Sequence, residues 1–258
     1  MKPASRRDDI LSLINEFGSV QVDILAERFQ TSRETIRRDL TELDAAGAIR
    51  KVHGGAKRAL PPSVVLSEGA FEARMAEQTV EKALIGRAAA ALFDEGSVIF
   101  VDTGSTTIAF ARALARRRGV TVITNSPEIA GVLARAEAQH RVYLLGGEVA
   151  AKGQETLGAL AVEQLERFKA EHVVLTVGAV THSDIMDYDL RETEMARAMI
   201  ARAHCVTVLA DYTKLCRAAV FDVAALKDVD RLVTDRAPQP DMAQALQAAG
   251  VEVIIATS

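Results

Sequence analysis

Cysteine is scarce in this chain of 258 residues, which contains only Cys205 and Cys216. Two thiols are too few for the disulfide framework of a small secreted domain, and no cysteine or histidine pair has the spacing of a zinc-binding motif. We therefore expect a protein of the reducing cytoplasm that uses no metal and no cofactor.

Long hydrophobic runs are lacking as well. The longest, around residues 88–93, ends at Asp94 and Glu95 and is far shorter than the roughly 18 residues that a membrane-spanning helix requires. The first twenty residues alternate charged and apolar side chains, which is not the pattern of a signal peptide. We expect a soluble protein with no membrane partner.

Several catalytic and nucleotide-binding motifs are missing. The sequence contains no GxxxxGK followed by Ser or Thr, no GxGxxG, no GxSxG and no HExxH. These absences remove the main support for nucleoside triphosphatases, dinucleotide-binding enzymes, hydrolases with a nucleophile elbow and zinc proteases.

The net charge of −4 argues against a nucleic-acid partner until the chain is divided. Residues 1–60 carry 11 Lys and Arg against 9 Asp and Glu, whereas residues 61–258 carry 20 against 26. The length suits two folded domains at about 150 residues each. Because the prolines at 61 and 62 end the helical periodicity, we predict one domain over 1–60, a linker over 61–74 and a second domain over 75–258.

The N-terminal segment has the pattern of three short helices joined by tight turns. Apolar residues recur at helical spacing over Arg6–Phe17, again from near Val22, and again from Arg33 to Leu43, with Gly18 and Gly47 as helix-terminating glycines. An alternating strand over Ile49–Ala56 follows and contains a Gly-Gly pair. This order predicts a winged helix-turn-helix.

The third predicted helix has a polar, mostly cationic side opposite Ile36, Leu40 and Leu43. In a recognition helix, arginine pairs with guanine and glutamate accepts from cytosine, while neighbouring arginine and threonine side chains hold phosphates. For any one of these residues the alternative is a solvated helix surface. We expect operator DNA as a partner, and the candidate DNA-binding residues are Ser32, Arg33, Glu34, Thr35, Arg37, Arg38, Thr41, Arg50, Lys51, His53, Gly54 and Gly55.

The C-terminal segment alternates buried strands with helices, which predicts a mostly parallel sheet covered on both faces. The predicted strands are Val98–Val101, Val120–Thr124, Val142–Leu145, Val173–Val177, Cys205–Leu209, Arg231–Thr234 and Val251–Ile255. The fold class is therefore α/β, and ligands are expected beyond the carboxyl ends of the strands.

Polar or glycine-rich sequence follows five of these strands, with hydroxyls and helix amides for an anion and Lys214 as its cation. Carboxylates such as Asp102, Glu148 and Asp211 suit sugar hydroxyls, so the set predicts a small phosphorylated sugar or polyol as effector. Taken one at a time, each residue is equally a helix cap or turn glycine. The candidate effector-binding residues are Asp102, Thr103, Gly104, Ser105, Thr106, Thr107, Thr124, Asn125, Gly146, Gly147, Glu148, Gly178, Asp211 and Lys214.

The sequence resembles the DeoR family of bacterial transcriptional regulators. The resemblance rests on Thr35–Leu40, which reads TIRRDL, on HGGA at 53–56, and on the stretches VDTGST, VITN, LGGE and DYTK in the C-terminal half. It implies a sensor domain similar to ribose-5-phosphate isomerase. Two stretches depart from the family's pattern: Lys214–Arg217 reads KLCR instead of KFGR, and residues 181–187 replace a glycine-rich turn.

Two functions fit these observations. The first is a repressor of carbohydrate-metabolism genes that works as a homo-oligomer, a dimer or tetramer, and leaves its operator when the effector binds; an activator would use the same residues. The alternative is a sugar-phosphate isomerase-like enzyme with an appended DNA-binding module, in which Glu148 or Asp102 would serve as base. His172 and His204 are expected to be structural, and Cys216 is either inert or sensitive to oxidation.

Overall fold

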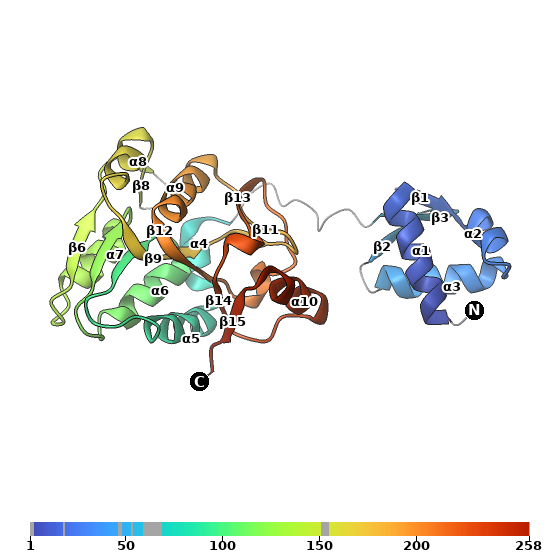
Figure 1. Cartoon of the computed structure of the whole chain (residues 1–258), viewed down its shortest axis with the longest axis horizontal. Coiled ribbons are helices and arrows are strands. Elements are labelled where there is room, and N and C mark those ends of the chain that lie inside the picture. The colour runs from blue at the N-terminus through green and yellow to red at the C-terminus, as the bar shows by residue number, and fades with distance from the viewer. Residues whose placement is uncertain are drawn as a thin grey trace. The chain divides into compact units, whose positions relative to one another are not determined.

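The protein is described here from a computed structural model, which covers residues 3–17, 19–45, 48–52, 54–58, 69–150 and 155–257. The chain divides into two compact units, Met1–Ser63 and Val64–Ser258, each with its own hydrophobic core (Figure 1). None of the helices among the described residues has the length and apolarity needed to cross a lipid bilayer.

The first unit is the winged helix-turn-helix that the sequence predicts. Its described residues form α1 (Pro3–Phe17), α2 (Val22–Arg28) and α3 (Arg33–Ala45), followed by β2 (Ile49–Val52) and β3 (Gly55–Arg58). A further short strand, β1 (Ser19–Gln21), pairs with β3, so that the strand order is β1-β3-β2 with antiparallel pairing. Three residues are too few for an alternating pattern, which explains why β1 was not predicted. Gly18 and Gly47 lie outside the described residues.

An ion pair links α1 to α3 in this unit. Arg6 Nε lies 2.6 Å from Asp39 Oδ2, and Asp39 is buried although Arg38 before it is exposed. Because a buried carboxylate needs a partner, this contact fixes α1 against α3. The apolar residues Ile36 and Leu40 complete the buried side of α3.

The second unit contains a parallel sheet. In the described part of this unit, seven strands run in the order β15-β14-β12-β9-β4-β5-β6, and every pairing in the sheet is parallel. All seven correspond to the strands predicted from the sequence, to within three residues at each end. They are β4 (Val98–Val101), β5 (Thr121–Thr124), β6 (Arg141–Leu144), β9 (Ala170–Thr176), β12 (Ala203–Leu209), β14 (Arg231–Thr234) and β15 (Glu252–Ile255).

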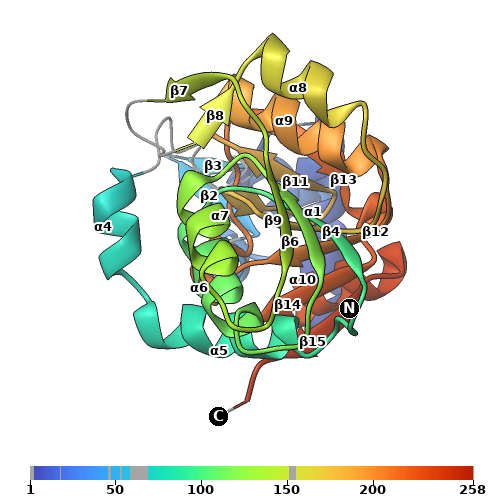
Figure 2. The same cartoon turned by 90° about the vertical axis from the view of Figure 1, so that its left-hand side faces the viewer.

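Helices cover both faces of the sheet, which confirms the α/β fold class. On one face α5 (Thr79–Ala90), α6 (Ser105–Leu114) and α7 (Pro127–Ala134) pack against Ile99, Val101 and Val122. On the other face lie α8 (Ala159–Leu165), α9 (Leu190–Ala201) and α10 (Pro240–Ala249). They pack against Phe100, Val173 and the other strand side chains that point to this face. Figure 2 shows the two sets of helices on opposite sides of the strands.

Smaller elements surround the carboxyl ends of the strands. They comprise the hairpin β7 (Glu148–Ala150) and β8 (Glu155–Leu157), the sheet of β10 (Ala179–Val180), β11 (Asp184–Asp187) and β13 (Phe221–Ala225), and the turns η1 (Tyr212–Lys214) and η2 (Leu226–Asp228). The helix α4 (Phe71–Ala76) begins inside the segment 61–74 that was expected as linker and ends two residues beyond it. Phe71 is 5% exposed and belongs to the second unit's core, because an aromatic ring at this point can be buried under α6.

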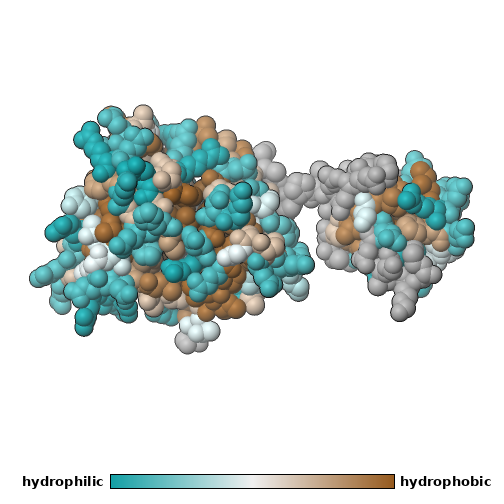
Figure 3. Space-filling view, in the orientation of Figure 1, coloured by the Kyte–Doolittle hydropathy of each residue, from teal (hydrophilic) through white to brown (hydrophobic). Residues whose placement is uncertain are grey.

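Figure 3 shows hydrophobic residues exposed in patches between hydrophilic ones. Some of the larger exposed hydrophobic side chains belong to the outer strand β6, where Tyr143 and Leu144 are exposed. An outer strand with exposed apolar side chains is a surface that a second chain can cover.

Candidate functional sites

The first candidate site is the exposed side of α3. The helix begins at Arg33, because the Ser32 hydroxyl accepts a hydrogen bond from the Thr35 amide at 3.2 Å and lies 2.8 Å from the Thr35 hydroxyl. Serine is one of the residues favoured at this capping position. It sets the face of α3 that points to solvent, on which Arg37 is 64% exposed.

The exposed arginines of α3 make only loose ionic contacts within the described residues. Arg33 Nε lies 2.8 Å from Asp23 Oδ1 and Arg37 lies 3.9 Å from Glu34, and all four side chains are more than half exposed. Exposed pairs of this kind contribute about 0–1 kcal/mol. The guanidinium groups can therefore exchange these carboxylates for phosphates or base edges at little cost.

The wing is tied to the same helix. Lys51 Nζ donates to Thr41 Oγ1 at 2.8 Å, and the Lys51 amide donates to Asp44 Oδ1 at 2.9 Å. Gly55 needs its small size, because a Cβ at that position would lie 2.4 Å from the Val20 carbonyl oxygen in β1. Gly54 has φ +81°, a left-handed conformation that favours glycine in the turn.

The structure therefore places the predicted DNA-binding residues on one helix face and the adjoining wing. Glu34, Arg38 and Thr41 are exposed, and Thr35 is half-buried at the cap. His53 lies outside the described residues, and for Arg50 the structure describes the backbone alone. Their contact with DNA stays a prediction.

The second candidate site is a cavity at the carboxyl ends of the parallel strands. The strand order reverses between β4 and β9, and in open α/β sheets ligands bind at such a reversal. A cavity of about 220 Å³ opens beside this point. It is lined by Gly69, Arg74, Glu77, Gln78, Lys82, Ser105, Thr106, Thr176, Tyr188, Asp211, Thr213, Lys214 and Arg217.

The chemistry of this lining suits an anion. Its described residues include the cations Arg74, Lys82, Lys214 and Arg217, and they outnumber the carboxylates. Ser105 and Thr106 form the first turn of α6, a helix of ten residues, whose amides carry the positive end of the helix dipole. A phosphate group placed here would meet both kinds of positive charge.

Gly104 brings α6 close to the neighbouring strand. A Cβ at position 104 would lie 2.0 Å from Thr176 Cγ2, at the end of β9. Gly178 is needed for a similar reason, because its Cβ would lie 2.6 Å from the ring of Tyr188, which lines the cavity. These two glycines, both predicted as site residues, let the walls of the cavity approach each other.

Lys82 is a site residue that the sequence reasoning missed. It is 6% exposed, and its ammonium group donates to the carbonyl oxygens of Arg74 at 2.5 Å and Glu77 at 2.8 Å. Burial lowers the pKa of this lysine, and nearby Lys214 lowers it further, while Asp211 acts in the opposite direction. The sequence does contain a signal for this residue. Lys82 falls on the buried stripe of α5 with Ile85, Gly86 and Ala89, and a lysine is rarely buried unless it has a polar partner.

A group of carboxyl side chains lies beside the cavity. Burial raises the pKa of Asp102 well above its usual range. Burial and then the charge of Asp102 raise the pKa of Glu155 to about 8, and burial together with Glu155 raises the pKa of Glu192 to about 9. Arg74, part of the cavity lining, lowers the pKa of both glutamates.

At neutral pH the two glutamates therefore retain protons in the folded protein. A protonated carboxyl group can both donate and accept a hydrogen bond, as can a sugar hydroxyl. The sequence reasoning missed Glu155 and Glu192, because β8 and α9 reach the ends of β4 and β5 only through the tertiary fold. Asp102 was predicted.

Asn125 links the cluster of carboxyl side chains to Thr103, which follows β4. Its side chain accepts from Thr103 Oγ1 at 3.2 Å and donates to Glu155 Oε2 at 3.3 Å, and the residue is completely buried. Thr124 and Thr107 are also buried, with hydroxyls bonded to the Ser126 amide and the Gly104 carbonyl. The hydrogen bonds of these three residues fix the loops after β4 and β5 beside the cavity.

The remaining predicted effector residues divide between the cavity and its surroundings. Ser105, Thr106, Asp211 and Lys214 line the cavity. Gly146 and Gly147 lie at the β6–β7 connection, where the Gly146 amide donates to Gln164 Oε1 at 3.0 Å. Glu148 is exposed on β7 and pairs with Arg191 at 3.4 Å. Tyr188 and Arg74 join the site from segments that carry no signal in the sequence, whereas Arg217 belongs to the Lys214–Arg217 stretch that departs from the family's pattern.

Comparison with known proteins covers both units. A family model described as the DeoR-like helix-turn-helix domain matches residues 6–60, and one described as the DeoR C terminal sensor domain matches residues 77–236. Together the two models span most of the chain.

Individual relatives match over nearly their whole length. The chain is 34% identical to the HTH-type transcriptional repressor CsqR of Escherichia coli K12, over 97% of this chain and 94% of that protein. It is 32% identical to the glycerol-3-phosphate regulon repressor of the same organism, over 95% and 96%. Both relatives are named as repressors. Among solved structures, ribose 5-phosphate isomerase A from Neisseria gonorrhoeae aligns with 52% of each chain at 18% identity and a TM-score of 0.36.

Proposed function

Because this chain belongs to the DeoR family of transcriptional regulators, we propose that it represses carbohydrate-metabolism genes and leaves its operator when a phosphorylated sugar or polyol binds the second unit. The observation that carries the proposal is the cavity at the β4–β9 reversal. The cavity combines four cations with the first turn of α6, and the carboxyl groups of Glu155 and Glu192, whose pKa values are raised, lie beside it.

The two halves of the site correspond to the two halves of such a ligand. Arg74, Lys82, Lys214 and Arg217 would bind the phosphate, with the amides of Ser105 and Thr106. The carboxyl groups of Glu155 and Glu192 would bind hydroxyls. An unphosphorylated sugar would offer these cations no negative charge, so the phosphate should dominate affinity.

Operator recognition is assigned to α3 and the wing of the first unit. One recognition helix contacts few bases, so useful specificity requires at least two copies on spaced half-sites. We infer a homo-oligomer for this reason, and the exposed apolar side chains of β6, Tyr143 and Leu144, offer one surface for it.

Release follows if the effector prefers one conformation of the oligomer over another. A ligand that binds both conformations equally shifts nothing, whatever its affinity. The sugar phosphate must therefore favour the conformation in which the two recognition helices no longer match the half-sites.

The test begins with selection of bound sequences from a random DNA pool by the full-length protein. The selected duplex is then titrated with pentose phosphates, hexose phosphates and glycerol 3-phosphate, with the unphosphorylated compounds in parallel, and DNA binding is followed by fluorescence anisotropy. We expect at least one phosphorylated compound to release the DNA and raise the melting temperature of the protein, while its unphosphorylated form does neither.

A Lys214→Ala variant tests whether the cavity is the effector site. It should bind the selected DNA as the parent does, because Lys214 lies in the second unit, but it should need a higher concentration of the active compound. Equal release by phosphorylated and unphosphorylated compounds would overturn the assignment of the cavity. Failure to select any DNA would overturn the assignment of the first unit.

A further inference from the structure

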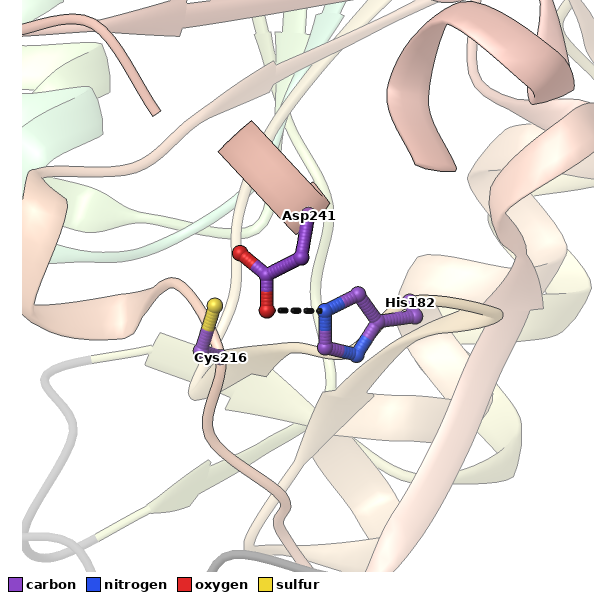
Figure 4. Close-up of side chains that lie close together, drawn as sticks. All are labelled: His182, Cys216 and Asp241. Atoms are coloured by element: carbon purple, nitrogen blue, oxygen red, sulfur yellow. Dashed lines mark hydrogen bonds and ion pairs between the residues drawn. The ribbon is translucent and has the colours of Figure 1, made fainter. Parts of the chain in front are cut away.

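The three side chains His182, Cys216 and Asp241 come together outside the cavity. Their donor atoms, an imidazole nitrogen, the cysteine sulfur and a carboxylate oxygen, all lie within 4.8 Å of one another. Figure 4 shows the Asp241 carboxylate between the Cys216 sulfur and the His182 ring. We propose that these residues form a binding site for a zinc ion.

The fold brings three distant segments to this point. Val180, the last residue of β10, forms an isolated parallel bridge with Leu215, and the Arg217 amide donates to the Val180 carbonyl at 3.3 Å. These contacts place Cys216 next to the turn that carries His182. Asp241 arrives from the first turn of α10. Separation along the chain explains why spacing in the sequence predicted no metal site.

The distances match those that zinc requires. Two nitrogen or oxygen ligands at about 2.0–2.1 Å from a tetrahedral zinc ion lie about 3.3 Å from each other. His182 Nε2 and Asp241 Oδ2 are 3.2 Å apart, already one edge of such a tetrahedron. In a zinc site the Cys216 sulfur would lie about 3.6 Å from each of the other two ligand atoms. Because the three atoms already lie within 4.8 Å of one another, each separation from the sulfur needs to shorten by about 1.2 Å at most to complete a face of the tetrahedron.

The carboxylate is oriented for this purpose. Asp241 Oδ1 accepts a hydrogen bond from the Met242 amide at 2.9 Å, so Oδ2 is the oxygen that faces His182. Metal-binding carboxylates are commonly held by a second hydrogen bond of this kind.

The backbone at Cys216 has a φ of +57°, in the left-handed region that favours glycine. The family's KFGR stretch has glycine at this position. The cysteine at residue 216 therefore places a sulfur beside His182 and Asp241 on a backbone suited to glycine.

The donor set selects the metal. One nitrogen, one oxygen and one sulfur ligand suit zinc, whereas magnesium and calcium prefer oxygen alone. On binding, the Cys216 thiol gives its proton to solvent and its sulfur forms the bond to zinc, and no electrons are transferred. Three protein ligands leave a fourth position for water.

The site adjoins the cavity along the chain. Lys214 and Arg217, which line the cavity, lie within two residues of Cys216. A bound zinc ion would fix the 214–217 segment between β10 and α10, and with it two of the cations of the cavity. The zinc site itself does not depend on the proposed effector.

The test uses the full-length protein and cobalt(II) as a spectroscopic substitute for zinc. Titration should give the near-ultraviolet charge-transfer band of a cobalt–thiolate bond and the intense visible bands of a tetrahedral site, and one equivalent of zinc should remove both. Cys216→Ser should abolish the charge-transfer band. His182→Gln and Asp241→Asn should each weaken cobalt binding by at least tenfold, and circular dichroism should show that all three variants remain folded.

Cys205→Ser is the matched control, because Cys205 lies on β12 and is the other cysteine of the chain. This variant should keep the full cobalt spectrum. Absence of a charge-transfer band in the parent protein would overturn the proposal. Persistence of the band in Cys216→Ser would overturn it as well, as would unchanged affinity in both His182→Gln and Asp241→Asn.

Discussion

Gly104 and Thr176 approach so closely that a Cβ on residue 104 would lie 2.0 Å from Thr176 Cγ2. The contact joins the loop after β4 to the end of β9, at the point where the strand order reverses. The φ of Gly104 is 169°, an extended conformation open to any residue, so space is the constraint.

A Gly104→Ala substitution should therefore destabilise the second unit by about 1–3 kcal/mol, as overpacking of a tight interior does. Removing Cγ2 with Thr176→Ser in the same chain should recover most of the loss. Urea unfolding of the single and double variants measures both effects. If the double variant is no more stable than Gly104→Ala alone, the contact with Thr176 is not the source of the strain.

Lys82→Met should impair the response to a phosphorylated effector while leaving DNA binding intact. Methionine keeps most of the buried stem but removes the ammonium group, so the concentration for half-release should rise by at least tenfold. Loss of the hydrogen bonds to the carbonyls of Arg74 and Glu77 should also cost about 1–3 kcal/mol. Lys227→Met, at an exposed lysine of η2, is the control and should change neither quantity. An unaltered release curve for Lys82→Met would exclude Lys82 from the effector site.

Arg37→Ala should abolish binding to the selected operator without unfolding the first unit. The side chain is 64% exposed and its contact with Glu34 is long at 3.9 Å, so stability should change by less than about 0.5 kcal/mol. Loss of a bidentate base contact costs about 1–3 kcal/mol at each half-site, which a gel-shift assay resolves. Arg118→Ala, at an exposed arginine of the second unit, should bind as the parent does. Retained operator binding by Arg37→Ala would contradict the assigned recognition face.

The raised pKa values of Glu155, which is buried, and Glu192, which is half-buried, predict the direction in which stability depends on pH. The folded-state pKa values of Glu155 and Glu192 are raised to about 8 and about 9, from 4.5 in the unfolded chain. Between these limits the unfolded chain releases protons that the folded protein keeps. The free energy of unfolding should therefore fall as pH rises from about 5 to 9, by up to about 1.4 kcal/mol per pH unit for each proton difference.

Glu192→Gln tests this dependence, because glutamine keeps the shape and carries no titratable proton. Its free energy of unfolding should change less between pH 5.5 and pH 8.5 than that of the parent. Glu194→Gln, at an exposed position of α9, should follow the parent curve. Equal slopes for the parent and Glu192→Gln would contradict the raised pKa.

Local patterns in the sequence were enough to predict the three helices of the first unit and the seven parallel strands of the second. Apolar alternation and helical spacing depend on burial of one face, which is a property of each segment. Ser105, Thr106, Asp211 and Lys214 could be found because the ends of parallel strands must converge. The same rule failed to separate them from Asn125 and Thr124, whose polar groups face inward.

The rest of the site depends on contacts between remote segments. Glu155 comes from a three-residue strand and Glu192 from the first turn of α9, and neither differs from an ordinary surface glutamate in the sequence. The grouping of His182 with Cys216 and Asp241 is of the same kind. Lys82 differs, since its position on an apolar stripe follows from helical spacing alone.

The hydrogen bonds of Lys82 have a consequence for how binding could reach the rest of the chain. Its ammonium group donates to the carbonyl oxygens of Arg74 and Glu77 at the C-terminal end of α4. This is the first helix of the second unit along the described chain. A phosphate in the cavity would compete with those carbonyls for the same three protons. Binding of the phosphate would then weaken the hydrogen bonds between Lys82 and the end of α4 and leave the parallel sheet unchanged.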